Sequence, residues 1–347
     1  MKKIKIGRQI ISLQYKPYVI VEACVNHQGN FKIAKKMIIA SKKTGAQCIK
    51  FQHHIVDEEM LRDVPMSKNF DVPLDKIIEK TNFTLKQHKE LKKICKNVGI
   101  DYLCTPFSIK AADELNSIGV SAFKTGSGEL TNFPFIQHLA KIGKPMIVST
   151  GMSTPDEINE TVKIIKKFKT PLALMHCISA YPCPYEIMNL DFIKELSNFY
   201  NIPVGLSDHT PSIYNALGAV SLGASLIEKH FTFNKKLAGP DHKSSINLME
   251  LKQLVEGCNA NFLARGKKKI VFKEEQEIVA WARESVVTIK SIEKNEKINK
   301  LNVTTKRPSA KTGQIPANEF FKIINKKARA KRLIKANIIL KYADLKK

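Results

Sequence analysis

The chain has 347 residues, of which 43% are hydrophobic and 26% are charged, values typical of a globular protein and not of a disordered segment. Its length allows one large domain and one small domain. No apolar run approaches the roughly 20 residues that a membrane span needs, and the start MKKIKIGRQIIS lacks the apolar region and cleavage site of a signal peptide. We therefore expect a cytoplasmic protein with no membrane partner.

The formal net charge of +25 would suit a protein that binds nucleic acid. Only seven of the 57 basic residues are arginine, however, and lysine is less suited to bidentate contacts with bases or phosphates. The lysines are also spread along the chain, so we interpret them as a solvated surface that attracts anionic substrates. Binding of a polyanion such as a nucleic acid remains the alternative. The seven cysteines form no CxxC pair, which favours reduced core thiols.

Short β-branched runs alternate with amphipathic helical patterns from Tyr18 onward. The capping box of TPDEINE, for example, predicts a helix that begins after Thr154. Strand and helix units number eight by Gly266, the count of a (β/α)8 TIM barrel. An open doubly wound sheet would need a GxGxxG turn after its first strand, where the sequence reads VNHQGN. Strands are predicted at 18–27, 48–52, 101–107, 122–128, 146–151, 172–177, 203–208 and 225–233.

The pattern changes after Gly266. The barrel is therefore assigned to residues 1–266, and a charged linker is predicted over residues 267–283. Residues 284–347 hold short mixed elements with 17 basic and 5 acidic residues, which predicts a small basic second domain.

Polar residues stand where the predicted strands end, and active sites of (β/α)8 barrels lie at that end of the barrel. Taken singly, a lysine such as Lys50 or Lys124 has an ordinary alternative as a solvated loop residue. Together with three small hydroxyls, however, two inward lysines describe a site for a dianion that carries phosphate and carboxylate. His209 and His230 end the seventh and eighth strands, so we expect them to converge and bind Mn, Zn, Fe or Co. An amidohydrolase barrel would instead need an HxH motif on the first strand, where His27 stands alone.

Ten segments, in this order, closely resemble the sialic acid synthase family: EACVNHQGN, IKFQHH, CTPFS, FKTGSGE, IVSTGM, HCISAYPCPYE, GLSDHT, IEKHFT, GPDH and KRPS. Members of this family join a barrel to a C-terminal antifreeze-like (SAF) domain. The resemblance implies a transferase that condenses phosphoenolpyruvate with the open-chain aldehyde of an N-acetylated hexose. N-acetylmannosamine is the first choice for this acceptor sugar. The products would be a nine-carbon 2-keto acid, N-acetylneuraminate, and phosphate. A legionaminic or pseudaminic acid synthase that uses a diacetamido sugar remains open.

The resemblance also implies a divalent metal and a role for each site residue. Mn²⁺ is the first choice and Mg²⁺ or Co²⁺ the others, with His209 and His230 as ligands. Glu22 joins these two histidines as a catalytic residue. The phosphoenolpyruvate positions are Lys50, Thr105, Lys124, Ser127, Ser149, Ser179 and Ser207, and the positions for the sugar are Gln52, Tyr181, Glu228, Asp241 and Arg307.

Arg307 lies in KRPS, and in this family that arginine reaches into the barrel of the partner subunit, so the resemblance implies a domain-swapped homodimer. Two positions depart from the family pattern. Ser179 stands where some members have asparagine, and KRPSAKTG lacks the glycine that often follows KRP. Both departures bear on how the sugar is chosen and not on the class of reaction.

Overall fold

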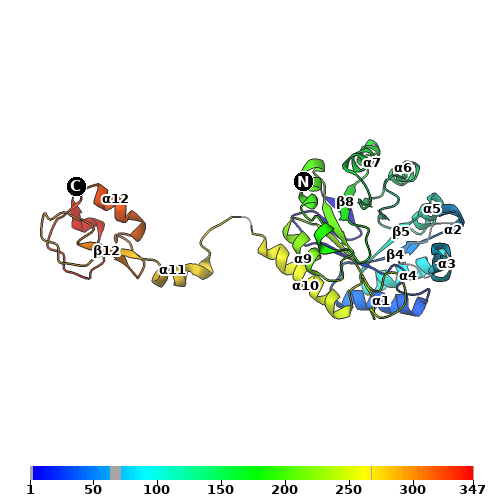
Figure 1. The fold of residues 1–347 in the computed structure, drawn as a ribbon, viewed down its shortest axis with the longest axis horizontal. Helices are drawn as coiled ribbons and strands as arrows, with labels where there is room; N and C mark the ends of the chain where they lie inside the picture. Colours follow the sequence, from blue (N-terminus) through cyan, green and yellow to red (C-terminus); the bar gives the residue numbers. More distant parts are fainter. Residues whose placement is uncertain (1–2, 63–71, 267, 347) are drawn as a thin grey trace. The chain divides into compact units, whose positions relative to one another are not determined.

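The computed structural model describes residues 3–62, 72–266 and 268–346. The chain divides into two compact units, Met1–Gly266 and Lys267–Lys347. In the first unit, eight strands form one parallel sheet in the order β5-β4-β3-β10-β9-β8-β7-β6, with helices around its outside (Figure 1). The predicted (β/α)8 barrel is thereby confirmed.

Each of the eight predicted segments forms a strand of the barrel. The strands are β3 (Tyr18–Glu22), β4 (Cys48–His53), β5 (Asp101–Pro106), β6 (Phe123–Thr125), β7 (Met146–Ser149), β8 (Leu172–Cys177), β9 (Val204–Asp208) and β10 (Leu226–His230). Several strands end earlier than predicted because the chain turns into the loops above the barrel. After β3, for example, the amide of Asn26 donates to the carbonyl of Ala23 at 3.0 Å and starts a turn.

Helices follow the strands around the barrel. They are α1 (Phe31–Lys43), α2 (Val56–Glu59), α3 (Leu74–Thr81), α4 (Leu85–Val98), α5 (Ile109–Ser117), α6 (Phe133–Ile142), α7 (Pro155–Lys167), α8 (Phe192–Tyr200), α9 (Tyr214–Ser221) and α10 (Leu248–Ala264). The predicted capping box of α7 is present, since Thr154 and Glu157 each accept the backbone N–H of the other. No helix was predicted between the second and third strands, where α2, α3 and α4 lie.

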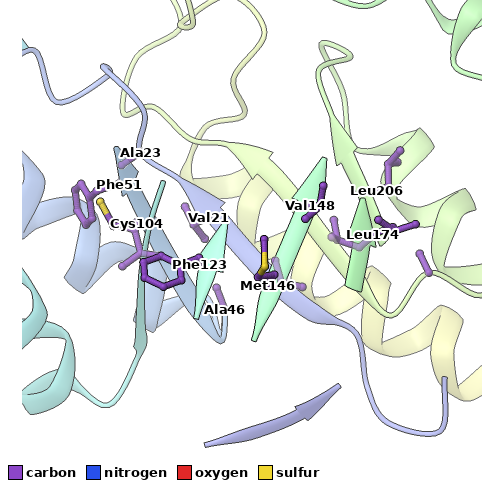
Figure 2. Close-up of a cluster of buried hydrophobic side chains, with 14 of the residues drawn as sticks. Val21, Ala23, Ala46, Phe51, Cys104, Phe123, Met146, Val148, Leu174 and Leu206 are labelled. Carbon is purple, nitrogen blue, oxygen red and sulfur yellow. The ribbon is translucent and has the colours of Figure 1, made fainter. Parts of the chain in front are cut away.

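The side chains of the strands alternate between two apolar layers. Val21 points outward into the layer beneath the helices (Figure 2) and Val19 belongs to the same layer, whereas Tyr18 and Ile20 point into the barrel. The inner layer also contains Ile4, Ile6 and Ile11 of a hairpin that was not predicted, β1 (Ile4–Ile6) with β2 (Gln9–Ile11). These isoleucines fill the barrel interior below the level at which the strands end.

The barrel interior is narrow where β9 passes β10. A Cβ atom added at Gly205 would lie 2.4 Å from the carbonyl oxygen of Leu226 and 2.7 Å from the sulfur of Met175. Only glycine fits at this inward position, because any side chain would displace backbone. The polar residues that follow on β9 therefore begin above a tightly filled floor.

The second unit has a small apolar core of its own, which includes Val286, Ile298 and Ile315. Its elements are η2 (Lys273–Glu275), α11 (Gln276–Ala282), β11 (Ser285–Thr288), β12 (Val303–Lys306), α12 (Phe320–Asn325), β13 (Arg329–Ala330) and β14 (Leu345–Lys346). The predicted linker thus contains the helix α11. The assignment of residues 284–347 to an antifreeze-like domain remains a prediction. Among the described residues of both units, no helix is long and apolar enough to cross a membrane.

Candidate functional site

A cavity of about 110 Å³ lies at the carboxyl end of the barrel strands. Its walls contain thirteen of the fifteen residues predicted for the site. They are Glu22, Lys50, Gln52, Thr105, Lys124, Ser127, Ser149, Tyr181, Ser207, His209, Glu228, His230 and Asp241. The other two are Ser179, which lies beside the cavity near Ser127, and Arg307, which belongs to the second unit.

The alternation of the strands explains why these residues meet. Side chains two positions apart on a strand point to the same face. Leu226 of β10 belongs to the inner layer, so Glu228 and His230 also point inward. Cys48 of β4 also belongs to the inner layer, so Lys50 points inward as well. The site residues on these strands are therefore the polar continuation of inward apolar rows, whereas Tyr181 and Asp241 reach the cavity from loops.

Four charged side chains are buried together in this cavity. Lys50 forms an ion pair with Glu22 and lies 3.9 Å from Glu228, whereas Lys124 lies 3.6 Å from Glu228. Lys124 also donates to Ser149 Oγ at 2.7 Å. All four side chains are at most 5% exposed. Neither lysine is the solvated loop residue of the alternative interpretation.

The two carboxylates of this group differ in their pKa. Burial raises the pKa of Glu22 by more than the adjacent Lys50 lowers it. Burial would also raise the pKa of Glu228, but Lys124 and Lys50 outweigh it and the pKa is lowered. Glu228 is therefore the carboxylate that stays ionised, while Glu22 is the group that more readily carries a proton. For Lys124, burial is the largest effect and lowers its pKa.

Small hydroxyl groups converge beside Lys124 on the backbone of Gly151. A Cβ atom at Gly151 would lie 2.5 Å from Ser179 Oγ and 2.6 Å from Ser127 Oγ. Two hydroxyls and the backbone thus enclose a space that a side chain would block. Hydroxyl donors next to a buried ammonium group suit a compact anion such as phosphate or carboxylate.

A second group of polar side chains could hold a metal ion. Ligand atoms of Cys24, His230 and Asp241 all lie within 4.8 Å of one another. Nδ1 of His230 is buried and has no hydrogen-bond partner among the described residues. His209 lies beside His230, with 5.4 Å between the ring centroids, so the predicted convergence of the two histidines is found. Nδ1 of His209 donates to the carbonyl of Ile178 at 2.8 Å, which leaves Nε2 as its free ligand atom.

The donor set therefore fits a divalent transition metal, because nitrogen, oxygen and sulfur donors meet at one buried place with an unpartnered imidazole nitrogen. The cavity thus places a cationic, hydroxyl-lined half beside a half that could hold a metal. Such a pairing suits a reaction between an anion and a carbonyl compound.

Comparison with known proteins assigns the chain to a family. The model of the NeuB family matches residues 37–270, which is more than half of the chain. The chain belongs to the NeuB family. An N,N'-diacetyllegionaminic acid synthase of Campylobacter jejuni is 36% identical to this NeuB chain over 92% of this chain and 99% of that protein. An uncharacterized protein of Methanocaldococcus jannaschii is 39% identical over 89% and 90% of the two chains.

The fold of the NeuB chain is also similar to a solved structure. This structure is an N-acetylneuraminic acid synthetase from Leptospira borgpetersenii in complex with citrate. The TM-score is 0.74 at 31% identity, over 80% of this chain and 95% of that chain. The resemblance to sialic acid synthases is thus confirmed at the level of the family.

The NeuB chain also places residues in the cavity that were not predicted there. All seven cysteines are free and buried, but Cys24 and Cys177 line the cavity, which corrects their assignment as core thiols. Phe107 and Gly126 line it as well. The signal for Cys24 was its position two residues after Glu22, which extends the inward row of β3.

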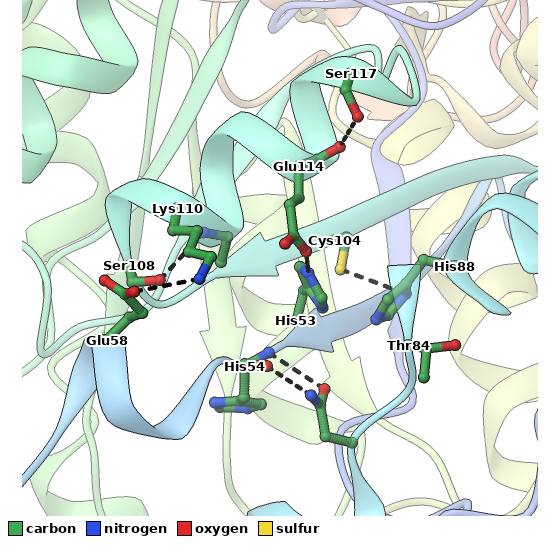
Figure 3. A network of polar contacts seen from close by, with 12 residues as sticks. His53, His54, Glu58, Thr84, His88, Cys104, Ser108, Lys110, Glu114 and Ser117 are labelled. Atoms are coloured by element: carbon green, nitrogen blue, oxygen red, sulfur yellow. Dashed lines mark hydrogen bonds and ion pairs between the residues drawn. The ribbon is translucent and has the colours of Figure 1, made fainter. Parts of the chain in front are cut away.

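Polar contacts behind the cavity wall hold the end of β4. His53 contacts Glu114 at 2.7 Å, and the backbone of His54 exchanges two hydrogen bonds with the side chain of Asn82 (Figure 3). Nε2 of His54 lies 3.2 Å from Gln52 Oε1, and the His54 ring stacks on Phe107 at 4.1 Å between centroids. Gln52 is therefore oriented by its neighbours and not left free to rotate.

The buried carboxyl group of Glu129 should make the NeuB chain less stable as the pH rises. Burial raises its pKa from 4.5 to about 7, and its Oε2 is buried without a hydrogen-bond partner among the described residues. Between these pH values only the folded chain keeps the proton, so stability that is complete below pH 4.5 is lost as the pH rises through 7. Replacement of Glu129 by Gln should remove this dependence, which amounts to about 3 kcal/mol. Denaturant unfolding of both proteins from pH 4 to pH 8 checks this, and parallel curves would contradict it.

Proposed function

We propose that this NeuB-family chain condenses phosphoenolpyruvate with the open-chain aldehyde of an N-acetylated six-carbon sugar. A nine-carbon 2-keto acid and phosphate would be the products. The observation that carries the proposal is one cavity in which two buried lysines and a set of hydroxyls adjoin a possible metal site. The similarity to the C. jejuni N,N'-diacetyllegionaminic acid synthase supports this class of reaction. The similarity of the fold to the Leptospira N-acetylneuraminic acid synthetase supports it as well.

Lys124, Ser149 and the hydroxyls around Gly151 would bind the phosphate and carboxylate of phosphoenolpyruvate. Carbon 3 of phosphoenolpyruvate then attacks the aldehyde carbon of the sugar. Water adds at carbon 2, and phosphate leaves as the bond between this carbon and the phosphate oxygen breaks. The buried site favours these steps because donors that are fixed before the reaction need no reorganisation when charge develops.

His209 and His230, with Asp241 beside them, would hold a divalent metal such as Mn²⁺. The metal, when bound, supplies Lewis-acid polarisation of a carbonyl oxygen, worth several kcal/mol. Glu22 is placed to hold a proton at its carboxyl group next to Lys50, in keeping with its raised pKa. Gln52 and Tyr181 would contact the sugar from the same cavity.

The direct test is phosphate release from phosphoenolpyruvate with a panel of three acceptors. These are N-acetylmannosamine and the diacetamido sugars that lead to legionaminic and to pseudaminic acid. We expect one acceptor to give turnover that a chelator abolishes and Mn²⁺ restores. The C. jejuni relative supports the legionaminic precursor, and N-acetylmannosamine is the acceptor expected from the sequence.

Absence of phosphate release with all three acceptors and with several divalent metals would refute the proposal. Full turnover of metal-free enzyme in the presence of chelator would refute the metal site. Steeply salt-dependent binding of nucleic acid without any metal requirement would instead support the polyanion alternative.

Arg307 provides a separate prediction about the second unit. Its guanidinium lies over the Trp281 ring, 5.4 Å from the centroid, within that unit. We propose that it contacts the acetamido carbonyl of the sugar from the partner subunit of a domain-swapped homodimer. Arg307→Ala should then lower kcat/KM for the sugar about ten- to a hundredfold, the value of a charge-assisted hydrogen bond of about 1.5 to 3 kcal/mol. Binding of phosphoenolpyruvate should be unchanged.

The measurement is steady-state kinetics with each substrate varied, and Arg329→Ala is the control because it removes one exposed arginine from the same unit. Mixing Arg307→Ala chains with Lys124→Ala chains should recover part of the activity. One of the two sites in the mixed dimer then combines a barrel with an intact Lys124 and an intact Arg307 from the other chain. Heterodimers that form but recover nothing would show that Arg307 acts within its own chain or not at all.

A further inference from the structure

We propose that the thiolate of Cys24 is a direct ligand of the metal, so that the site prefers thiophilic ions such as Fe²⁺, Co²⁺ and Zn²⁺ over Mg²⁺. The inference rests on the proposed function for the presence of a metal in the cavity. It goes further by adding a sulfur donor to the two histidines and by changing the class of metal that fits.

The position of Cys24 is the first argument. Its sulfur shares the 4.8 Å group with ligand atoms of His230 and Asp241, and all three residues line the same cavity. Cys24 is 8% exposed, His230 6% and Asp241 9%. The three donors thus come together largely shielded from water, where a metal ion would compensate both the Asp241 carboxylate and a Cys24 thiolate.

The backbone of Cys24 is the second argument. Its φ of 40° lies in the left-handed region, where glycine costs nothing and a residue with a Cβ is disfavoured. Hydrogen bonds fix this conformation, because the Cys24 amide donates to Glu22 Oε1 at 2.7 Å and the Ala23 amide to the Lys50 carbonyl at 2.9 Å. A side chain kept at a strained position beside a site is a sign that it has a function there.

The chemistry of the donors is the third argument. A set of one thiolate, imidazole nitrogen and one carboxylate suits Fe²⁺, Co²⁺ or Zn²⁺ and leaves positions open for a substrate oxygen. Mg²⁺ demands oxygen ligands in near-ideal octahedral geometry and would be poorly held by this set. The thiolate therefore strengthens the preference for these ions that the histidines already provide.

Cys177 is the competing thiol in the cavity. Its sulfur lies 3.8 Å from His209 Nδ1, 3.9 Å from Ser179 Oγ and 3.5 Å from Ser127 Oγ. Cys177 thus belongs to the hydroxyl-lined half and is absent from the group formed by Cys24, His230 and Asp241. The two cysteines give a matched pair for an experiment, because each is buried and lines the same cavity.

The test is a titration of the metal-free full-length protein with Co²⁺, read as the near-ultraviolet charge-transfer band from sulfur to cobalt. We expect the band in the wild type and in Cys177→Ser, and its loss in Cys24→Gly. Co²⁺ should bind Cys24→Gly at least about tenfold more weakly. Loss of a residue that only hydrogen-bonds to a metal ligand already lowers metal affinity by about that factor. The preference for Zn²⁺ over Mn²⁺, measured by competition, should shrink by a similar factor. Glycine suits the backbone at this position, so the variant should fold at least as stably as the wild type.

Co²⁺ binding to the wild type without a thiolate band would overturn the inference, as would a band that survives in Cys24→Gly and disappears in Cys177→Ser. Phosphate release by the wild type, measured in parallel, separates the two proposals. Turnover without a thiolate band refutes the ligand and leaves the function intact. A band without turnover on any acceptor supports the ligand and counts against the proposed function.

Discussion

His230→Ala is expected to lower turnover about a thousandfold while the barrel stays folded. Nδ1 of His230 is buried without a partner among the described residues, and the residue stands between His209 and the Cys24–Asp241 pair. Its loss should remove the metal, whose contribution of several kcal/mol corresponds to about three powers of ten in rate. Phosphate release and Mn²⁺ binding to the same preparation are the two measurements.

The control for this variant is His176→Ala. His176 is also a buried histidine near the end of a barrel strand, but it donates to the Met188 carbonyl at 2.6 Å and does not line the cavity. Some loss of stability with unchanged metal affinity is expected for it. Equal metal binding by His230→Ala and wild type would assign His230 to the structural core.

Lys124→Met should lower kcat/KM for phosphoenolpyruvate about a hundred- to a thousandfold, the usual effect of removing one fixed donor from a desolvated site. Methionine keeps most of the buried volume, but the ammonium group that faces Ser149 and Glu228 is lost. The anion would then approach Glu228 with only Lys50 left to oppose its charge. Titration of each substrate separately measures the effect, and the affinity for the sugar should change little.

Lys252→Met is the matched control for the loss of one positive charge. Lys252 is exposed on α10 and pairs only loosely with Glu256, at 3.8 Å. If both variants weakened phosphoenolpyruvate equally, the general charge of the surface and not the buried ammonium would be responsible. A change confined to the sugar would show that the anion subsite had been misplaced.

Much of the barrel was predictable because each of its parts has a local signature. β-Branched runs, capping residues such as Thr154 and the count of units indicate the architecture. The inward direction of Lys50 and Lys124 follows from the same alternation that buries Cys48 and Ala122. The cavity could thus be approached from the sequence by extending the apolar row of each strand.

Other features depend on contacts that no local pattern records. The hairpin β1–β2 has strands of three residues, too short for a periodic signal, and it is stabilised by the inner layer of the barrel. The position of Cys24 two residues after Glu22 indicates that it points inward, but its positive φ and its approach to Asp241 and His230 appear only in the folded chain. The role of Arg307 depends on an assembly of two subunits, so it stays a prediction.

The pairing of β3 with β10 joins the first and last strands of the barrel, in register from Tyr18 and Leu226 to Glu22 and His230. During synthesis the first strand therefore waits until about 200 more residues have emerged, roughly 10 to 40 seconds at 5 to 20 residues per second. Cys24 follows the first of these strands, and His230 and Asp241 come with the last. The proposed ligands come together only when the ring closes, so a metal ion bound by them cannot nucleate the early half of the barrel. Metal binding by this group should instead require that the chain has been translated beyond Asp241.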